Sequence, residues 1–273
     1  MGSKAVVKLP VLISVPHGGT KVPKEVKGFC KLSIVDILRD GDTWSRELYG
    51  LKEQVALYLD TEVARAVVDL NRHPDDRAPI NPDGVTKTVT VDGVQVWGSP
   101  TGLNEKVSNY LIATYHSPYH RALKEMVAGK EAIVALDCHT MLGIGPENSV
   151  DQGKARPLVC ISNRGGNLGQ AKGETITAPS ELVQSFAKAL SKAFEHQDME
   201  VQTDLVDINN PFKGGYITKA HGGLGKLPWI QVEISRQLYI SADTIIEEKP
   251  SYKVQAKLSD LRAKFASAVK DIV

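Results

Sequence analysis

The chain has 273 residues, 42% of them hydrophobic and 24% charged, enough to bury the core of one large α/β domain spanning residues 1–273. Its 33 Lys and Arg residues balance 32 Asp and Glu residues, so charge indicates neither a nucleic-acid partner nor an anionic membrane surface. No apolar run approaches the roughly 18 residues of a membrane-spanning helix. The N-terminus lacks a signal-peptide core, and three unpatterned cysteines are typical of a reduced, cytoplasmic protein. The oligomeric state stays open.

The first predicted element is a buried strand over residues 11–17, which ends in His17 and continues into a glycine-rich loop. The apolar positions that follow, from Leu48 to Leu59, have helical spacing and predict a helix. Asp42 or Thr43 fits the N-cap of that helix, because its side-chain oxygen would accept from free backbone N–H groups. Asp42 is in addition a carboxylate that could serve a functional site.

Residues 61–70 are rich in β-branched and apolar side chains and predict a strand, which ends in Asn71 and Arg72. Residues 75–100 contain many Asp, Pro, Gly and Thr residues and predict an excursion from the core. Within it, residues 86–90 and 95–97 are typical of a hairpin.

A helix is predicted over residues 104–116. Pro118 ends it and starts a second helix, with Ser117 as the cap. His120 lies on that second helix, where a packing or hydrogen-bonding role is more common than metal binding.

A buried strand over residues 132–139 is the strongest strand pattern, and it delivers Asp137 and His139 to one edge of the sheet. The glycine-rich loop at 163–169 matches neither a P-loop nor a dinucleotide-binding motif. Further strands are predicted at 158–162, 200–204 and 229–236, and further helices at 180–195 and 252–272.

His17 and His139 both follow buried strands, and open α/β sheets keep their ligands at the carboxyl ends of strands. One such histidine alone is more often structural, but two at matching positions favour a metal site. With Asp42, or with Asp40 as the alternative, they form a two-His, one-carboxylate set with an open fourth position, as in catalytic zinc sites. Another divalent ion is the alternative metal. Asp137 would then support a ligand histidine from behind.

Glu233 lies in an apolar strand, where a carboxylate is costly unless it is paired or functional. A pair with Arg236 is the structural interpretation. The functional one is a general base with a raised pKa beside a metal. Arg65, Asn71 and Arg72 lie close together in sequence, and the planar guanidinium of arginine suits a carboxylate ligand.

Short motifs spread over roughly residues 11–240 follow one another in a distinctive order. They are Pro16-His17-Gly18-Gly19 with Pro23, Asp40-Gly41-Asp42 before Leu48-Tyr49, Arg65 with Asp69-Leu70-Asn71-Arg72, Pro118-Tyr119-His120, Asp137-Cys138-His139-Thr140, Asn210-Pro211-Phe212-Lys213-Gly214-Gly215-Tyr216, and Glu233-Ile234-Ser235-Arg236. Together they resemble the N-formylglutamate amidohydrolase family of zinc-peptidase-like hydrolases. The resemblance implies an α/β fold with a mixed sheet flanked by helices, zinc-carboxypeptidase-like (phosphorylase/hydrolase-like).

The resemblance also implies roles for individual residues. His17 and His139 match the zinc histidines, and Glu233 matches the glutamate that activates water. Asn71 and Arg72 resemble the pair that holds a substrate α-carboxylate. The resemblance further implies that Arg65 contacts the substrate carbonyl or a second anionic group of the substrate. It also implies that Lys213 contacts the γ-carboxylate and that Tyr216 contacts the substrate.

Three positions depart from related patterns. Thr20 stands where zinc carboxypeptidases carry a glutamate ligand, which leaves the third ligand to Asp42 or Asp40. Gly18 and Thr140 stand where the family usually has serine after each histidine.

The activity implied by the resemblance is zinc-dependent hydrolysis of N-formyl-L-glutamate, a small anionic substrate, to formate and L-glutamate in histidine degradation. One alternative is a related metallo-deacylase or carboxypeptidase that acts on another N-acyl amino acid or a peptide. Another is a carboxylate-binding protein without catalysis, and a metal-dependent phosphohydrolase ranks last.

Overall fold

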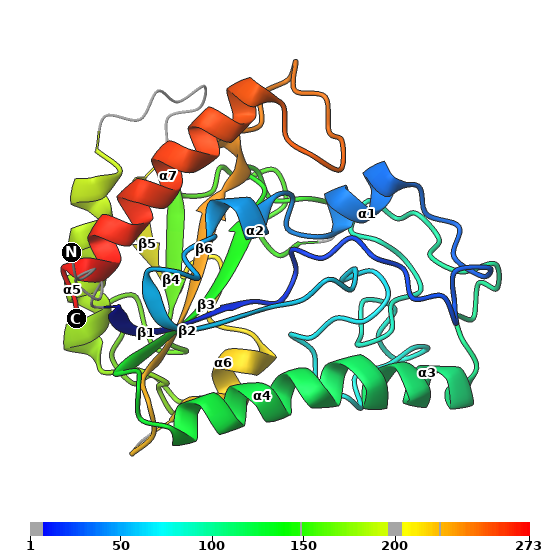
Figure 1. Ribbon diagram of the computed structural model, residues 1–273, viewed down its shortest axis with the longest axis horizontal. Helices are drawn as coiled ribbons and strands as arrows, with labels where there is room; N and C mark the ends of the chain where they lie inside the picture. Colours follow the sequence, from blue (N-terminus) through cyan, green and yellow to red (C-terminus); the bar gives the residue numbers. More distant parts are fainter. Residues whose placement is uncertain (1–7, 148, 196–203, 224) are drawn as a thin grey trace, which may run out of the picture.

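A six-stranded sheet forms the centre of the structure, a computed structural model that describes residues 8–147, 149–195, 204–223 and 225–273 (Figure 1). The strands are β1 (Leu9–Val15), β2 (Val55–Asp60), β3 (Val134–Met141), β4 (Val159–Ser162), β5 (Val206–Ile208) and β6 (Trp229–Ser235). They lie in the order β2-β1-β3-β6-β4-β5, and each neighbouring pair is parallel except β4 with β6. The predicted mixed sheet is confirmed.

Helices cover both faces of this sheet. They are α1 (Ile34–Asp40), α2 (Ser45–Leu48), α3 (Glu105–Leu111), the π-helical segment η1 (Ile112–His116), α4 (Ser117–Ala128), α5 (Ser180–Ala193), α6 (Tyr216–His221), the 3₁₀ turn η2 (Arg236–Leu238) and α7 (Tyr252–Lys270). Helices α2, α5 and α7 lie over one face, whereas α3, α4 and α6 lie over the other (Figure 1). Each face has its own apolar core. None of the described helices is both long and apolar enough to cross a membrane.

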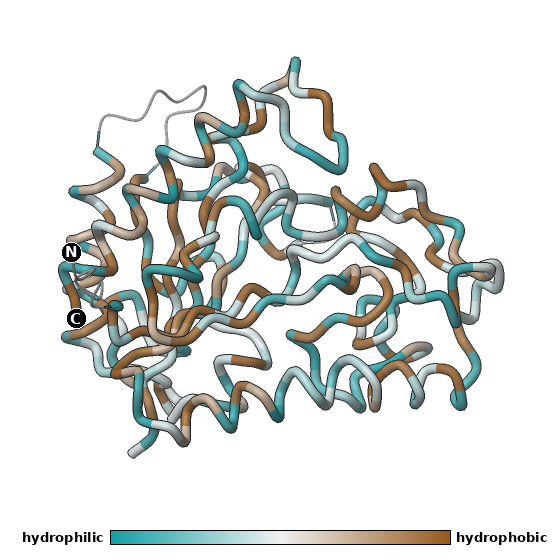
Figure 2. Tube along the Cα trace, in the orientation of Figure 1, coloured by the Kyte–Doolittle hydropathy of each residue, from teal (hydrophilic) through white to brown (hydrophobic). Residues whose placement is uncertain are grey.

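Strands β3 and β6 turn their polar residues towards one face, because successive side chains of a strand point in opposite directions. Leu136 and Cys138 pack in the core under α2, α5 and α7, so Asp137 and His139 face the side of α4 and α6. Glu233 on β6 is the register partner of His139 and faces the same side. The apolar strands around these residues run through the centre of the molecule (Figure 2).

The helix predicted from Leu48 to Leu59 is wrong. Helix α2 ends at Leu48, and the chain forms strand β2 from Val55, parallel to β1. Apolar residues three and four apart fit a helix, but the same segment alternates as a strand. Pairing with β1 satisfies backbone N–H and C=O groups along its length, and this tertiary pairing outweighs the local pattern.

The strand predicted over residues 61–70 is also wrong, since these residues form turns with single bridges at Val63 and Ala64. Their apolar side chains, including Val67 and Val68, are buried in the core beneath α4. Apolar, β-branched composition here reports burial rather than an extended backbone.

Two predicted caps differ in the structure. Helix α2 begins after Trp44, whose φ is 56°, and no side chain caps it. The Thr43 hydroxyl donates to the Leu38 carbonyl instead. Helix α3 continues through η1 into α4, so Ser117 caps nothing and Pro118 occupies the first turn of α4.

The predicted hairpin forms over a short length. Val89 and Gln95 make an antiparallel bridge, and the N–H groups of Thr90 and Val96 donate to the Val94 and Thr88 carbonyls at 2.9 Å. For the strand predicted at 200–204, residues 200–203 lie outside the described residues, and β5 begins at Val206. The other predicted strands and helices are present, to within a few residues at their ends, whereas α1 and α6 were not predicted.

Candidate active site

His17, Asp42 and His139 come together at the carboxyl edge of the sheet. His17 follows β1, His139 lies near the end of β3, and Asp42 lies in the turn between α1 and α2. The Nδ1 atoms of the two histidines are 3.2 Å apart. Oδ2 of Asp42 lies 3.1 Å from Nδ1 of His139 and 3.7 Å from Nδ1 of His17. All three side chains are buried, and their donor atoms lie within 4.8 Å of one another.

This donor set fits a metal ion. A tetrahedral zinc ion with ligand bonds of about 2.0–2.1 Å separates its donor atoms by roughly 3.4 Å, close to the spacings of the cluster. Burial lowers the pKa of His139, but the carboxylates of Asp137, Asp42 and Glu233 raise it well above its usual range. The surroundings therefore favour positive charge at this point, which a divalent cation would supply in place of a proton.

Two further carboxylates contact the imidazole rings at Nε2, the nitrogen that does not face the cluster. Nε2 of His17 lies 2.8 Å from Oδ1 of Asp69, and Nε2 of His139 lies 3.1 Å from Oδ2 of Asp137. The hydroxyl of Ser14 donates to the other oxygen of Asp137 at 3.1 Å. Each ring thus turns Nδ1 towards the cluster and Nε2 towards a carboxylate, an arrangement that orients metal-binding histidines.

Asp40 points away from the cluster. Its carboxylate accepts from Nζ of Lys87 at 2.8 and 3.1 Å and from the backbone N–H of Val91 at 2.8 Å. These three bonds tie the Asp40 carboxylate to the excursion that carries Lys87 and Val91. The geometry therefore favours Asp42 over the alternative ligand Asp40.

We expect Lys87→Met to lower the free energy of unfolding by about 3–5 kcal/mol, because it leaves the buried carboxylate of Asp40 without its cation. Lys87 is fully buried, and its Nζ also lies 2.7 Å from Oδ1 of Asp83. Chemical denaturation measures the loss. The matched control is Lys21→Met, whose exposed pair with Glu62 is screened by solvent and should contribute little to stability. Equal losses in the two variants would contradict the account.

Glu233 lies beside the cluster with 7% of its surface exposed. Its Oε1 accepts from Nε2 of Gln231 at 3.0 Å. Burial raises the pKa of Glu233 to about 7; the charge of Asp42 acts in the same direction and His139 opposes it. A carboxyl group with a pKa near neutrality can both take up and return a proton.

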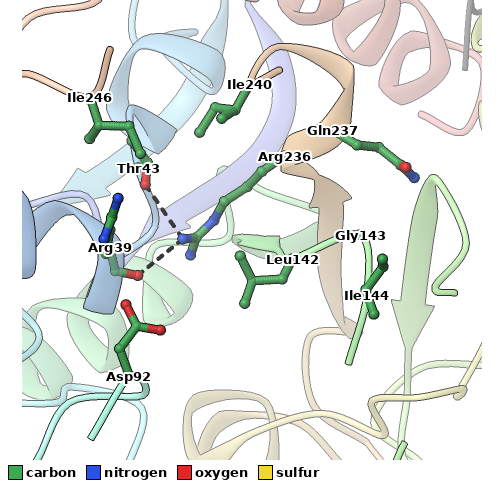
Figure 3. Close-up of a pocket in the computed structure, with 10 residues that line it drawn as sticks. All are labelled: Arg39, Thr43, Asp92, Leu142, Gly143, Ile144, Arg236, Gln237, Ile240 and Ile246. Carbon is green, nitrogen blue, oxygen red and sulfur yellow. Dashed lines mark hydrogen bonds between the residues drawn. The ribbon is translucent and has the colours of Figure 1, made fainter. Parts of the chain in front are cut away.

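Arg236 pairs with Asp42. Its Nη2 lies 3.3 Å from Oδ1 of Asp42, and Nη1 donates to the Arg39 carbonyl and the Thr43 hydroxyl (Figure 3). Among the described residues no ion pair joins Arg236 to Glu233, so that structural interpretation of Glu233 is not supported. Arg236 lines both the cavity over the cluster and a neighbouring one of about 570 Å³ (Figure 3).

A cavity of about 800 Å³ opens over the cluster, and Arg65, Arg72 and Lys213 line it. Arg65 donates from Nε to Asp69 at 3.1 Å, and Asp69 in turn contacts His17 of the cluster. Arg72 pairs through Nη2 with Asp83, while its buried Nε has no hydrogen-bond partner in the described part of the chain. The cavity therefore suits an anionic ligand.

Asn71 also lines this cavity, with its Nδ2 3.3 Å from Nε2 of His139. Its Oδ1 accepts from the backbone N–H of Ile217 at 2.8 Å. Tyr216 is not among the residues that line the cavity; its ring packs against His73, His116 and His120 instead. The geometry gives no direct substrate contact to Tyr216.

Sequence reasoning gave no role to three charged residues that the structure joins to the site: Asp69, Asp83 and Lys87. Asp69 stood inside a distinctive motif, which was an available signal. Asp83 and Lys87 are four residues apart in an Asp- and Pro-rich stretch, and nothing in that pattern shows that Lys87 is buried.

The fold and the site define a hydrolase of the α/β class, with a buried His-Asp-His cluster, a neighbouring glutamate and arginines around one cavity. A family model described as N-formylglutamate amidohydrolase matches residues 9–240. The chain belongs to that family, and it is accordingly an enzyme that acts on an amide.

Individual relatives agree with this assignment. The N-formylglutamate deformylase of Pseudomonas aeruginosa is 25% identical over 260 residues, covering 93% of this chain and 88% of that protein. The crystal structure of N-formylglutamate amidohydrolase from Ralstonia eutropha superposes with a TM-score of 0.73 at 22% identity, covering 96% and 93% of the two chains. A gene product of Agrobacterium tumefaciens gives a TM-score of 0.59 at 17% identity, covering 98% and 92%. These structures support the fold.

Proposed function

We propose that this enzyme hydrolyses the formamide C–N bond of N-formyl-L-glutamate to formate and L-glutamate, with zinc held by His17, Asp42 and His139. The observation that carries the proposal is the convergence of these donor atoms within 4.8 Å beside Glu233, in a cavity lined by arginines. The family and the named activity of the Pseudomonas relative support the substrate. Another divalent ion is the alternative metal.

Zinc at this centre would act as a Lewis acid on the formyl oxygen and make an attacking water more acidic. The chain's own residues supply the remaining chemistry. Asp69 and Asp137 keep the two imidazoles oriented. Glu233 takes the proton from the attacking water on its carboxylate and then delivers it to the leaving nitrogen. Its pKa of about 7, raised by burial, suits both transfers.

The arginines orient the substrate. Arg65 is held by Asp69 and by the Asp40 carbonyl at 3.1 Å, and its guanidinium would donate to the formyl oxygen as negative charge develops there. Arg72 and Asn71 receive the α-carboxylate. Lys213, on the same cavity wall, receives the γ-carboxylate.

We expect Arg72→Met to raise KM for N-formyl-L-glutamate about 10- to 100-fold, the effect of losing a charge-assisted hydrogen bond, with little change in kcat. Steady-state kinetics of formate release measure both constants. As the control, a formamide without the α-carboxylate should show the same KM in the two proteins. An unchanged KM for N-formyl-L-glutamate would exclude this carboxylate contact.

A substrate panel separates the proposal from its alternatives. It compares kcat/KM for N-formyl-L-glutamate, N-acetyl-L-glutamate and a peptide with a C-terminal glutamate. The proposal requires the highest kcat/KM for N-formyl-L-glutamate. A preference for the acetyl compound or the peptide would indicate a metallo-deacylase or a carboxypeptidase, and binding without any turnover would indicate a carboxylate-binding protein.

The proposed setting is histidine degradation in the cytoplasm. Cys30, Cys138 and Cys160 are all free thiols, which supports a reducing compartment.

A further inference from the structure

Histidines gather a second time in this molecule, away from the metal cluster. Four of the seven histidines form one group: three contact the ring of Tyr216 at the start of α6, and the fourth stacks on one of those three. They are His73, His116, His120 and His221. No step proposed above uses them.

Two of these histidines contact the backbone of the segment that carries Asn71 and Arg72. Nε2 of His120 lies 2.9 Å from the Leu70 carbonyl, and Nε2 of His116 lies 2.9 Å from the Arg72 carbonyl. A carbonyl oxygen only accepts, so both Nε2 atoms carry hydrogen and donate. The carbonyls on either side of Asn71 are therefore both held by imidazole rings.

The carbonyl between them is held as well. The backbone N–H of Tyr216 donates to the Asn71 carbonyl at 3.3 Å, next to the bond from the Ile217 N–H to the Asn71 side chain. Three consecutive carbonyls thus accept hydrogen bonds from α6 and from the helix of His116 and His120. These contacts fix the backbone of the segment that carries Asn71 and Arg72.

His221 contacts the second nitrogen of the His120 ring. Its Nε2 lies 2.9 Å from Nδ1 of His120. Burial, together with the nearby His116 and His221, lowers the pKa of His120 to about 3 and keeps this ring neutral. Since its single proton is on Nε2, Nδ1 accepts from His221. The hydrogen bonds therefore run in one direction, from His221 through His120 to the Leu70 carbonyl.

The helix that carries these rings has an unusual turn at this place. His116 is the last residue of η1, the π-helical segment between α3 and α4. The rings of His116 and His120 lie with centroids 4.3 Å apart, so both face the same backbone segment. Single π-turns within α-helices are rare and occur frequently at functional sites.

We propose that His116 and His120 are positioning residues for substrate binding, which hold the Leu70 and Arg72 carbonyls and thereby aim Asn71 and Arg72 at the substrate carboxylate. The inference rests on the proposed function, because it requires Arg72 to contact the substrate. It also places Tyr216 in the support of the site, behind the residues that line the cavity.

Two substitutions at His120 separate the two hydrogen bonds of its ring. The amide of His120→Gln reaches the position of Nε2 and keeps a donor to the Leu70 carbonyl. The shorter amide of His120→Asn reaches only the position of Nδ1, next to His221, and loses that donor. We expect His120→Asn to raise KM for N-formyl-L-glutamate about tenfold, the effect of one buried hydrogen bond, with kcat and bound metal unchanged. His120→Gln should stay within about twofold of the wild type.

Combining each change with Arg72→Met distinguishes positioning from a general structural effect. Because His120 is proposed to act through Arg72 and Asn71, His120→Asn should raise KM by a smaller factor once Arg72 is methionine than it does in the wild type. Independent, multiplying effects would overturn the inference, as would equal KM values for the Asn and Gln variants. If Arg72→Met alone leaves KM unchanged, the proposed carboxylate contact fails first. Should His120→Asn not fold, His116→Asn and His116→Gln make the same comparison at the Arg72 carbonyl.

Discussion

The Glu233→Gln variant should lose turnover by about 10²–10⁴-fold while it still binds metal, because the amide cannot take a proton from water or return one to the leaving nitrogen. The shape of the side chain is retained, and Oε1 of Glu233 contacts Gln231 rather than a metal ligand. Single-turnover formate release and metal analysis of the same preparation measure the two properties together.

The matched control for this variant is Glu62→Gln, which changes an exposed glutamate paired with Lys21. It should retain full turnover. Wild-type activity in Glu233→Gln would remove Glu233 from the reaction. A simultaneous loss of metal would assign Glu233 to the metal centre and not to proton transfer.

Asp42→Asn should weaken metal binding, and activity should fall with it. The loss of affinity should exceed the roughly 10–100-fold that follows when a residue hydrogen-bonded to a metal ligand is removed. The carboxylate of Asp42 lies 3.1 Å from His139, within the cluster. Its charge is favoured there: burial would raise the pKa of Asp42, but the hydrogen bond with His139 and the charges of both histidines lower it below its usual range. Equilibrium dialysis with zinc measures the affinity.

Asp40→Asn is the control two residues away. Asp40 is buried at the end of α1 and pairs with Lys87. This variant should keep its metal and lose stability instead, seen as a lower denaturation midpoint. If Asp40→Asn lost the metal and Asp42→Asn kept it, the assignment of the third ligand would be reversed.

The features of the site that sequence predicts well are those set by strand periodicity. His17 and His139 each follow a buried strand, and parallel strands bring their carboxyl ends to one edge. Glu233 was recognisable because burying a carboxylate inside an apolar strand is costly unless the group is paired or functional. The alternation of β6 then places it on the same face as His139.

The contacts that sequence reasoning could not find depend on long-range pairing. Nothing local separates Asp40 from Asp42, since only the position of Lys87, 47 residues further along, shows which aspartate is already paired. The pairing of Arg236 with Asp42 is of the same kind, at a separation of 194 residues. The helix predicted from Leu48 to Leu59 is wrong for a similar reason, because pairing with β1 decides the conformation of that segment.

The most direct test of the account is formate release from N-formyl-L-glutamate by one preparation, measured after chelation and again after stepwise addition of zinc. The account predicts no release from the chelated protein and recovery that saturates at about one zinc ion per chain, as expected for a single three-ligand site. Undiminished formate release from protein shown to contain no metal, or none from fully loaded protein, would contradict it.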